Sequence, residues 1–342
     1  MTTPFNDQKI LVVGGAGYVG SHMTKLLRET RHEPVVLDNL SSGFREAVLG
    51  AELIVGHLAD RMLLERVLRE RRFDAVMHFA SSIQVGESLA DPARYYRNNV
   101  AATLNLLECM VHAGVSCLVF SSSAAVYGEP ARAPLDEDHP RAPVNPYGRT
   151  KWMVEQVLGD FDRAYGLRHC CLRYFNAAGA DPAGLLGERH DPETHLIPLA
   201  LRAAGGALPA LQIFGTDYDT PDGTCIRDYV HVADLCRAHL LAIERLLGGA
   251  PSRAYNLGNG AGYSVRQVVE AAGRASGRPV PVIEAPRREG DPTRLVADAS
   301  RARAELGWRP KYDLDAIVRH ACAWEQRSAR RRVPAAPSAV RS

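Results

Sequence analysis

The first half of the chain alternates between short apolar runs and longer stretches in which apolar residues recur every three or four positions. Short runs rich in β-branched residues predict buried strands, and the recurring pattern predicts amphipathic helices. The strand-like runs are Ile10 to Val13, Val35 to Leu37, Leu53 to Val55, Ala75 to Phe79, Cys117 to Ser121 and His169 to Tyr174. The helix-like stretches include Leu63 to Leu68, Val100 to Met110 and Trp152 to Leu158. This alternation predicts an α/β fold with a doubly wound parallel sheet.

The pattern changes after about Asn176, where glycine- and proline-rich loops interrupt it, among them Ala177 to Pro192 and Phe214 to Thr224. Loops of this length in a compact chain are usually functional, so we expect a smaller C-terminal α/β lobe that binds substrate. The expected division gives residues 1–176 to the first domain, with about 228–262 returning to it. Residues 177–326 mainly form the second lobe, and 327–342 read as a disordered basic tail.

The charge, apolar runs and cysteines of the chain limit which ligands and which cell compartment are expected. The 342 residues carry a formal net charge of +2, which argues against a basic field for nucleic acid and favours a small-molecule ligand. No apolar run approaches the ~20 residues needed to span a bilayer, and the polar start from Met1 to Lys9 shows no signal peptide. We therefore expect a cytoplasmic protein without membrane association. The seven cysteines form no Cys-x-x-Cys pair and are expected to be buried thiols, and no metal-ligand cluster is expected.

A glycine-rich turn follows the first apolar run directly. Gly14, Gly17 and Gly20 open a helix after a buried strand, where small residues let backbone N–H groups approach a pyrophosphate. Asp38 ends the next strand, 18 residues past Gly20, and can accept hydrogen bonds from both ribose hydroxyls of an adenosine. A carboxylate there repels a 2′-phosphate, so NAD is favoured over NADP, although Arg45 lies a few residues later. The first domain is thus predicted to be a Rossmann-type NAD-binding domain.

Tyr147 and Lys151 stand four residues apart behind the serines that end at Ser123. On a helix this spacing places the ammonium beside the phenol, which favours the phenolate. Action at neutral pH requires the phenol pKa to fall by roughly three units from ~10. A single cation at ~6 Å, here the Lys151 ammonium, lowers the phenol pKa by about two of these units. The oxidised nicotinamide ring is the expected second cation. The pattern predicts nicotinamide redox chemistry in which proton and hydride transfer are coupled.

With these motifs assembled, the chain resembles the extended short-chain dehydrogenase/reductase family, and within it the UDP-galactose (UDP-glucose) 4-epimerases. The likeness runs in collinear order from about Lys9 to Trp324. The motifs that carry it are His78-Phe79-Ala80, Val85 to Ser88, Asn98-Asn99-Val100, Ser121 to Gly128, Arg173 to Asn176, Asp222-Gly223-Thr224, Arg227 to His231 and Arg287 to Asp291.

The resemblance implies a role for each matching residue. Tyr147 takes the proton of the sugar 4-hydroxyl, Lys151 lowers the phenol pKa and holds the nicotinamide ribose, and Ser123 binds the same sugar oxygen. The 4-keto sugar then turns over in the pocket and is reduced on its opposite face. Other implied cofactor contacts are Tyr18, Val19, Asn39, His57, Leu58, Phe79, Ala80, Asn98, Ser121 and Phe175. Implied contacts to the UDP-sugar are Asn176, His195, Leu196, Phe214, Arg227, Arg288, Asp291 and Leu295.

The sequence departs from some relatives at three positions expected near the ligands. His57 stands where aspartate meets the adenine amine, Ile83 where a lysine lies near the dinucleotide, and His195 where asparagine precedes Leu196. Leu295 is intermediate in bulk at a position where a large aromatic residue is associated with exclusion of N-acetyl sugars. Tolerance of UDP-N-acetylglucosamine is therefore one hypothesis. The resemblance also implies a homodimer packed through helices, for which Val100 to Met110 is the candidate stretch.

A few residues argue for or against other functions that proteins of this fold perform. A 4,6-dehydratase needs an acid and a base after the catalytic serine, where this chain has Ala124 and Ala125, and a decarboxylating relative likewise needs a carboxylate nearby. A net reductase is not strictly excluded. Epimerases of UDP-N-acetylhexosamines or UDP-pentoses stay open as alternatives, as does a non-catalytic NAD sensor, which needs the glycine turn but not the three catalytic residues together.

Overall fold

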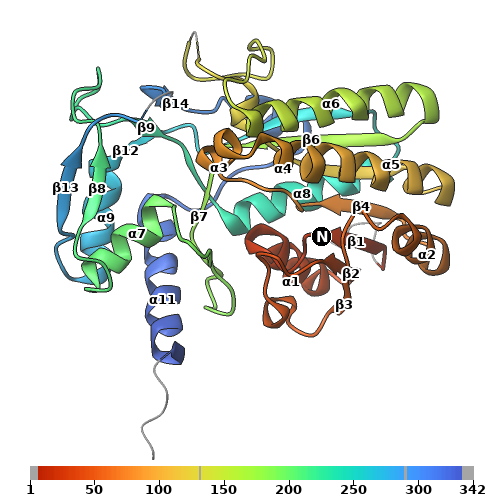
Figure 1. Cartoon of the computed structure of the whole chain (residues 1–342), viewed down its shortest axis with the longest axis horizontal. Coiled ribbons are helices and arrows are strands. Elements are labelled where there is room, and N and C mark those ends of the chain that lie inside the picture. Colours follow the sequence, from red (N-terminus) through yellow and green to blue (C-terminus); the bar gives the residue numbers. More distant parts are fainter. Residues whose placement is uncertain (1–6, 131, 289–290, 333–342) are drawn as a thin grey trace, which may run out of the picture.

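The computed structural model describes residues 7–130, 132–288 and 291–332 (Figure 1). Its largest element is a seven-stranded sheet in the order β11-β6-β5-β4-β1-β2-β3, in which every neighbouring pair is parallel. The strands are β1 (Lys9–Val13), β2 (Glu33–Asp38), β3 (Glu52–Val55), β4 (Ala75–His78), β5 (Cys117–Ser123), β6 (Arg168–Tyr174) and β11 (Arg253–Leu257). The predicted α/β fold with a doubly wound parallel sheet is confirmed.

Alternate residues of each strand enter two separate cores, as the strand period of two requires. Ile10 and Val12 pack with the helices α1 (Tyr18–Glu29) and α8 (Val232–Leu247). Leu11 and Val13 pack on the other face with α2 (Arg61–Arg71), α5 (Ala102–Ala113) and α6 (Pro146–Tyr165). Because both faces are covered, the strands can be apolar throughout, which explains why they stand out in the sequence.

Shorter helices connect these layers. Tyr96–Ala101 forms a π-helix, η2, that leads into α5, and 3-10 turns η1 (Arg45–Val48) and η3 (Ala124–Val126) follow β2 and β5. Two short helices, α3 (Val85–Ala90) and α4 (Pro92–Tyr95), precede η2.

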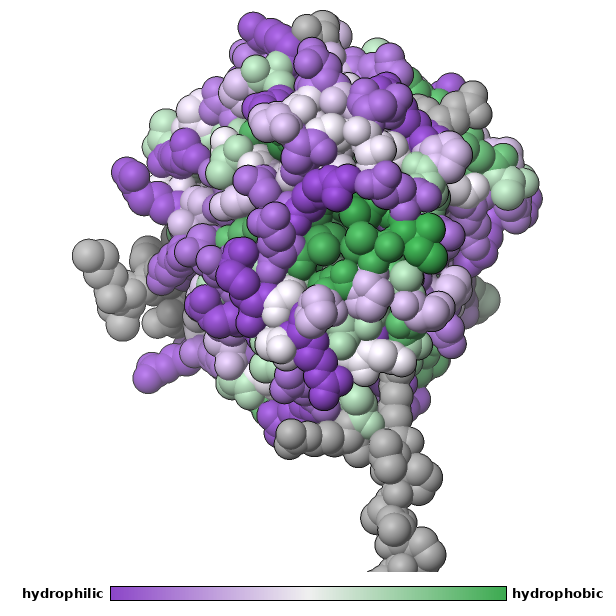
Figure 2. All heavy atoms as spheres, turned by 90° about the vertical axis from the view of Figure 1, so that its left-hand side faces the viewer, coloured by the Kyte–Doolittle hydropathy of each residue, from purple (hydrophilic) through white to green (hydrophobic). Residues whose placement is uncertain are grey.

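The second lobe gathers around a core shared by three helices (Figure 1). These are α7 (Leu196–Ala204), α9 (Val265–Ser276) and α11 (Leu314–Arg332). Small sheets pair β8 (Leu211–Phe214) with β13 (Val282–Ala285), β7 (Asn176–Ala178) with β10 (Tyr229–His231), and β9 (Ile226–Arg227) with β12 (Tyr263–Ser264) and β14 (Arg294–Leu295). Figure 2 shows an apolar area framed by polar side chains on this side of the molecule.

The chain passes between the lobes several times. After β10 it returns to the large sheet through α8 and β11, both within residues 228–262. It returns once more at α10 (Ser300–Glu305), because Ala302, Leu306 and Trp308 belong to the core on the α1 and α8 face. The indole Nε1 of buried Trp308 donates to the Asp234 carbonyl at 2.8 Å. The first core is thus completed by residues near the end of the chain.

Three further expectations can be compared with the structure. The predicted tail is wrong at its start, because α11 continues to Arg332 and residues 327–332 are helical; residues 333–342 lie outside the described part. All seven cysteines are free and buried, as predicted. Within the described ranges, no helix is long and apolar enough to cross a membrane.

Candidate active site

The predicted cofactor loop lies at the carboxyl end of β1. A side chain at Gly14 is excluded, because its φ is +78° and an added Cβ would lie 2.5 Å from the Ala80 nitrogen. Gly20 is equally constrained, with its Cβ position 2.1 Å from the Gly14 carbonyl oxygen. Gly17 differs, since an added Cβ would meet only ordinary contact at 3.5 Å. Packing within the protein therefore explains why Gly14 and Gly20 are glycines. Gly17 instead leaves open space at the N-terminus of α1, where no side chain caps the helix and an anion could approach the backbone N–H groups.

Asp38 closes the same loop from the end of β2. Its carboxylate accepts hydrogen bonds from the Ala16 nitrogen at 2.9 Å and the Leu40 nitrogen at 2.8 Å, and the side chain is buried. A carboxylate has about four lone-pair positions, so two remain for ribose hydroxyls. The loop, its charge and its helix N-terminus thus fit a dinucleotide with an unphosphorylated adenosine ribose.

The predicted catalytic residues come together where β5 ends and α6 begins. Asn145 caps α6 by accepting from the Gly148 nitrogen at 2.8 Å, and Gly148 packs so closely that a Cβ would lie 2.4 Å from the Ala125 carbonyl. This contact brings the phenol of Tyr147 to a hydrogen bond with Ser123. One turn later, the Lys151 ammonium lies 5.9 Å from the Tyr147 ring centroid.

Lys151 is 1% exposed, and its ammonium is held by two fixed acceptors. It donates to the Ser81 hydroxyl and to the Ser121 carbonyl, each at 2.7 Å, and lies 4.9 Å from the Phe120 ring centroid. Burial lowers the pKa of Lys151 to about 7, against the raising effect of the Glu155 carboxylate. A cation that titrates near neutrality is therefore positioned beside the phenol.

Residues expected to bind the UDP-sugar lie in the second lobe. Arg227 forms an ion pair with Asp291, and the register of β9 and β14 places Leu295 directly beside Arg227. The guanidinium of Arg288 stacks 3.9 Å from the ring centroid of Phe214. Asn176 begins β7, next to Phe175 at the end of the large sheet, and its nitrogen donates to the Asp228 carbonyl at 3.0 Å. Two arginines with a stacked ring suit a nucleoside diphosphate.

Comparison with known proteins agrees with this geometry. Residues 10–258 match the model of the NAD dependent epimerase/dehydratase family. The chain belongs to this family. It is 51% identical over 321 residues to the UDP-glucose 4-epimerase of Rhizobium meliloti, covering 94% of this chain and 98% of that protein.

Solved structures of related epimerases superimpose over nearly the whole chain. The crystal structure of UDP-glucose 4-epimerase from Brucella ovis in complex with NAD has a TM-score of 0.90 and 51% identity, with 92% of this chain and 97% of that chain covered. The UDP-Glc/GlcNAc 4-epimerase of Campylobacter jejuni has a TM-score of 0.83 and 45% identity, with coverages of 94% and 99%. The fold is therefore that of the family.

The remaining predicted cofactor residues of this family member lie in segments that follow the strands of the large sheet. Phe79 follows β4 and lies 4.8 Å from the His239 ring, measured between centroids, while Asn98 lies in η2 and donates to Ser82 and Asn99. His57 accepts from the Ala59 nitrogen at 2.9 Å through Nδ1, beside buried Leu58. Asn39 accepts from the Ser41 nitrogen at 3.0 Å, and Val19 lies one residue after Tyr18 in α1.

The surroundings of Tyr147 act on its pKa in two directions. Burial of the phenol raises this pKa, and the side chain of Ser123 lowers it. Burial disfavours the charged phenolate, so the expected lowering depends on cations placed beside it. The Tyr18 hydroxyl donates to the Gly179 carbonyl at 2.7 Å in the segment that joins the lobes, and a contact of Tyr18 with the cofactor stays a prediction.

The structure adds a buried network that sequence reasoning missed. Glu155 accepts from the Ser122 hydroxyl and forms an ion pair with Arg173 at 2.5 Å, and both side chains are 5% exposed. Arg173 also donates to the Tyr127 hydroxyl at 2.9 Å. Glu155 follows Lys151 by one helical turn, so its proximity to the lysine was visible in the spacing. Its partner on β6 was not.

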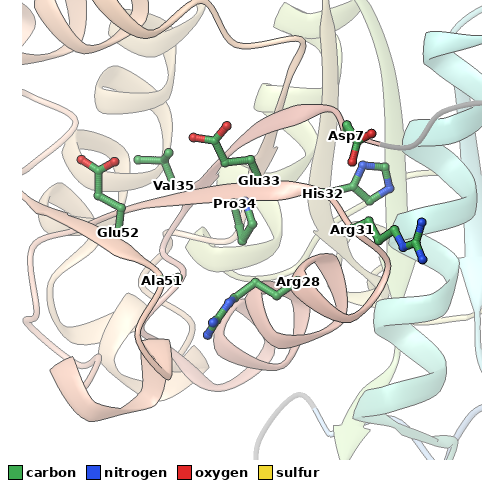
Figure 3. Close-up of a pocket in the computed structure, with 9 residues that line it drawn as sticks. All are labelled: Asp7, Arg28, Arg31, His32, Glu33, Pro34, Val35, Ala51 and Glu52. Carbon is green, nitrogen blue, oxygen red and sulfur yellow. The ribbon is translucent and has the colours of Figure 1, made fainter.

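The cavity drawn in Figure 3 lies elsewhere. It is lined by the end of α1, the turn at Arg31 and His32, the start of β2 and the start of β3. Asp38 stands at the opposite, carboxyl end of β2, where the predicted site residues gather. Ligand sites of open parallel sheets lie at that carboxyl end, so this cavity is not the active site.

The lowered pKa of Lys151 makes a prediction about stability. Because the folded pKa is about 7 and the unfolded value 10.5, the unfolded chain binds more protons between these pH values. Stability should therefore rise with pH in this window relative to Lys151→Met, by at most about 1.4 kcal/mol per pH unit. Urea unfolding of both proteins without dinucleotide, at pH 6.5 and 9.5, measures the difference. Equal differences at the two pH values would show that Lys151 keeps an ordinary pKa.

Proposed function

We propose that this protein interconverts UDP-galactose and UDP-glucose by NAD-dependent 4-epimerisation. The observation that carries the proposal is the enclosed cluster of Ser123, Tyr147 and Lys151. In the sequence, Ser123 is followed by Ala124 and Ala125, and not by acidic residues. Such a site handles one proton at one sugar oxygen and offers nothing to eliminate water or carbon dioxide. The similar proteins from Rhizobium meliloti and Brucella ovis, both named UDP-glucose 4-epimerases, support the same activity.

The dinucleotide is held, in this proposal, by the first lobe. Gly17 admits the pyrophosphate at the N-terminus of α1, and the free lone pairs of Asp38 receive the adenosine ribose. Lys151 binds the nicotinamide ribose while keeping its hydrogen bonds to the sheet edge. When bound, NAD accepts a hydride from sugar C4 and returns it.

Tyr147 removes the proton from the 4-hydroxyl and later gives it back, and Ser123 hydrogen-bonds the same oxygen. Burial raises the pKa of the phenol, and a neighbouring positive charge would lower it. Lys151 and, when bound, the oxidised cofactor would supply such charges beside Tyr147. Proton transfer is thereby tied to occupancy of the dinucleotide site.

The second lobe holds the nucleotide, with the diphosphate facing Arg227 and Arg288 and with Phe214 near the uracil. When phosphate binds, the Arg227–Asp291 ion pair either opens or persists while Arg227 also donates to the phosphate, because a guanidinium has five N–H donors. His195, Leu196 and Asn176 lie at the starts of α7 and β7, on the segments that join this lobe to the sheet.

The activity test uses purified protein without added cofactor. Incubation with UDP-galactose, followed by NMR of the anomeric proton, should show conversion to UDP-glucose. Conversion only after NAD addition would locate a weakness at His57 and Ile83, where the chain departs from relatives. No conversion of either UDP-hexose, with or without NAD, would reject the proposed activity and direct the assay to acetylated sugars and pentoses.

Leu295 sets a second expectation about substrate breadth. It is half-buried on β14 beside Arg227, and the similar Campylobacter jejuni protein is named for both glucose and N-acetylglucosamine forms. We expect Leu295→Tyr to reduce turnover of UDP-N-acetylglucosamine roughly 10- to 100-fold, because an overpacked pocket costs about 1–3 kcal/mol, while UDP-glucose is retained. Leu295→Met, which keeps the volume, is the control. Equal effects on both sugars would remove Leu295 as a determinant of substrate size.

We also propose a homodimer that works in the cytoplasm. Most apolar side chains of α5 are buried within the chain, but Leu104 is 38% exposed and Met153 on the neighbouring α6 is 40% exposed. These two side chains are the expected centre of a helix-to-helix contact. Seven free thiols suit a reducing compartment. Light scattering of the wild-type protein and of Leu104→Glu tests the dimer.

A further inference from the structure

Four side chains with metal-ligating atoms converge in the loop between β7 and α7. The potential ligand atoms of Glu188, His190, Glu193 and His195 all lie within 4.8 Å of one another. Sequence reasoning expected no such cluster. An irregular loop gathers these residues rather than one face of a helix, so their spacing alone matched no familiar pattern.

Four separations between these atoms can be compared with the edges of a tetrahedron. His195 Nδ1 lies 2.8 Å from Glu188 Oε1 and 3.2 Å from Glu193 Oε1. His190 Nδ1 lies 3.5 Å and 3.6 Å from the same two oxygens. A tetrahedral ion with bonds of ~2.0–2.1 Å holds its donor atoms about 3.3–3.4 Å apart. The four nitrogen-to-oxygen distances, 2.8–3.6 Å, thus lie around this value.

One buried nitrogen of the cluster makes no hydrogen bond. It is His190 Nδ1, which faces Oε1 of Glu188 and of Glu193. The Glu193 carboxylate is held in place, because its Oε1 accepts from the Thr194 and His195 nitrogens and its Oε2 pairs with Arg202 at 3.6 Å. Buried polar atoms in folded proteins nearly always have partners, so the free nitrogen of His190 points to a ligand between it and the two carboxylates.

We propose that Glu188, His190, Glu193 and His195 bind one Zn²⁺ ion. Imidazole nitrogens and carboxylate oxygens are ordinary zinc ligands, and four protein ligands make a closed structural site. Two carboxylates balance the charge of the ion, and the 44% exposure of the His195 side chain provides a route of entry. Because His195 is also an implied contact to the UDP-sugar, the proposal is tested by metal binding and not by turnover.

The surroundings of the four residues define what the ion would do. The Glu188 carbonyl accepts from the Trp324 indole of α11 at 3.0 Å, and the His190 ring meets the edge of Tyr18 in α1. Between them, Arg189 stacks 3.5 Å from the Phe44 ring centroid and pairs with Glu46 in η1 at 2.9 Å. Zinc would fix a loop that contacts both lobes, and its expected role is stability.

The test uses the full chain without an affinity tag, stripped with a chelator and dialysed. Titration with zinc sulfate, followed by elemental analysis after gel filtration, should give one zinc per chain. The thermal midpoint should rise by roughly 5 °C at zinc concentrations 100-fold above Kd. Co²⁺ should bind with a visible absorption band that zinc removes. Wild-type protein with less than one zinc for five chains and no midpoint shift would overturn the proposal.

Variants locate the ion. His190→Gln and Glu193→Gln should each weaken zinc binding at least about tenfold. His112→Gln, an exposed histidine at the end of α5, should bind zinc like the wild type. Stoichiometric binding that both cluster variants retain unchanged would place the ion elsewhere and overturn the assignment. If either variant fails to fold, the cobalt band of the wild-type protein still decides, because its energy and intensity distinguish tetrahedral from octahedral ligation.

Discussion

Tyr147→Phe is expected to lower turnover about 10²- to 10⁴-fold while NAD stays bound. The phenol hydroxyl is the only part removed, and it is the group that hydrogen-bonds Ser123. Lys151 keeps its hydrogen bonds to Ser81 and Ser121, so the residues expected to bind the dinucleotide are unchanged. Steady-state kinetics with UDP-galactose, together with the nucleotide content of the denatured protein, measures both effects.

Tyr165→Phe provides the matched control for this substitution. Tyr165 ends the same helix, α6, and is 61% exposed, so loss of its hydroxyl should leave turnover unaltered. Near-normal turnover of Tyr147→Phe would assign the base to another group. Loss of both turnover and bound NAD would mean that the phenol serves binding, and the proton-transfer role would then have to be abandoned.

Glu155→Gln is expected to cost about 3–5 kcal/mol of the free energy of unfolding, because it leaves a buried guanidinium without its carboxylate. Arg173 donates to the Glu155 carboxylate through Nε, which contacts both oxygens, and through one terminal nitrogen. Both side chains are almost fully buried. Removal of the negative charge should also lower the pKa of Lys151 further, since the carboxylate is what raises it. Urea unfolding, followed by fluorescence, gives the stability change.

Asp160→Asn is a close control on the same helix. Asp160 pairs with Arg163, but the two side chains are 69% and 75% exposed, so the same acid-to-amide change should shift stability by at most about 0.5 kcal/mol. A Glu155→Gln protein as stable as Asp160→Asn would contradict a structural role of the buried pair. Turnover of the folded fraction then tells whether Glu155 also acts through Lys151.

The large sheet could be predicted because most of its first six strands are covered on both faces, although β3 at the edge is partly exposed. A run such as Ile10 to Val13 is then apolar at every position, and the signal is strong. β11 was missed, since Arg253 and Asn256 interrupt its apolar residues at the edge of the sheet. The strands of the second lobe are two to four residues long and carry too little periodicity to be recognised.

The active site was predictable to the extent that its residues are near one another in the sequence. Tyr147 and Lys151 share one helix, and the glycine loop is contiguous. Arg173 reaches Glu155 from β6, and Ser81 reaches Lys151 from the end of β4, so only tertiary packing reveals these contacts. Burial of the Tyr147 phenol, which raises its pKa, also depends on the assembled lobes and not on the local sequence.

The helix at the end of the chain was also misjudged. Arginine and alanine are good helix formers, and residues 327–332 extend α11, whose earlier turns are anchored in the second core. The basic composition of this segment suggested disorder, but a helix that is already nucleated gains one hydrogen bond with each added residue.

The position of Trp308 has a consequence for synthesis of the protein. Domains commonly fold in order as they leave the ribosome, N-terminal first. Here the first core needs a buried indole, with its hydrogen bond to Asp234, from a residue more than 290 positions after β1. A nascent chain that stops at residue 258, where the family match ends, would expose the apolar surface that Ala302, Leu306 and Trp308 cover. The chain must therefore be synthesised nearly to its end before either core can be completed.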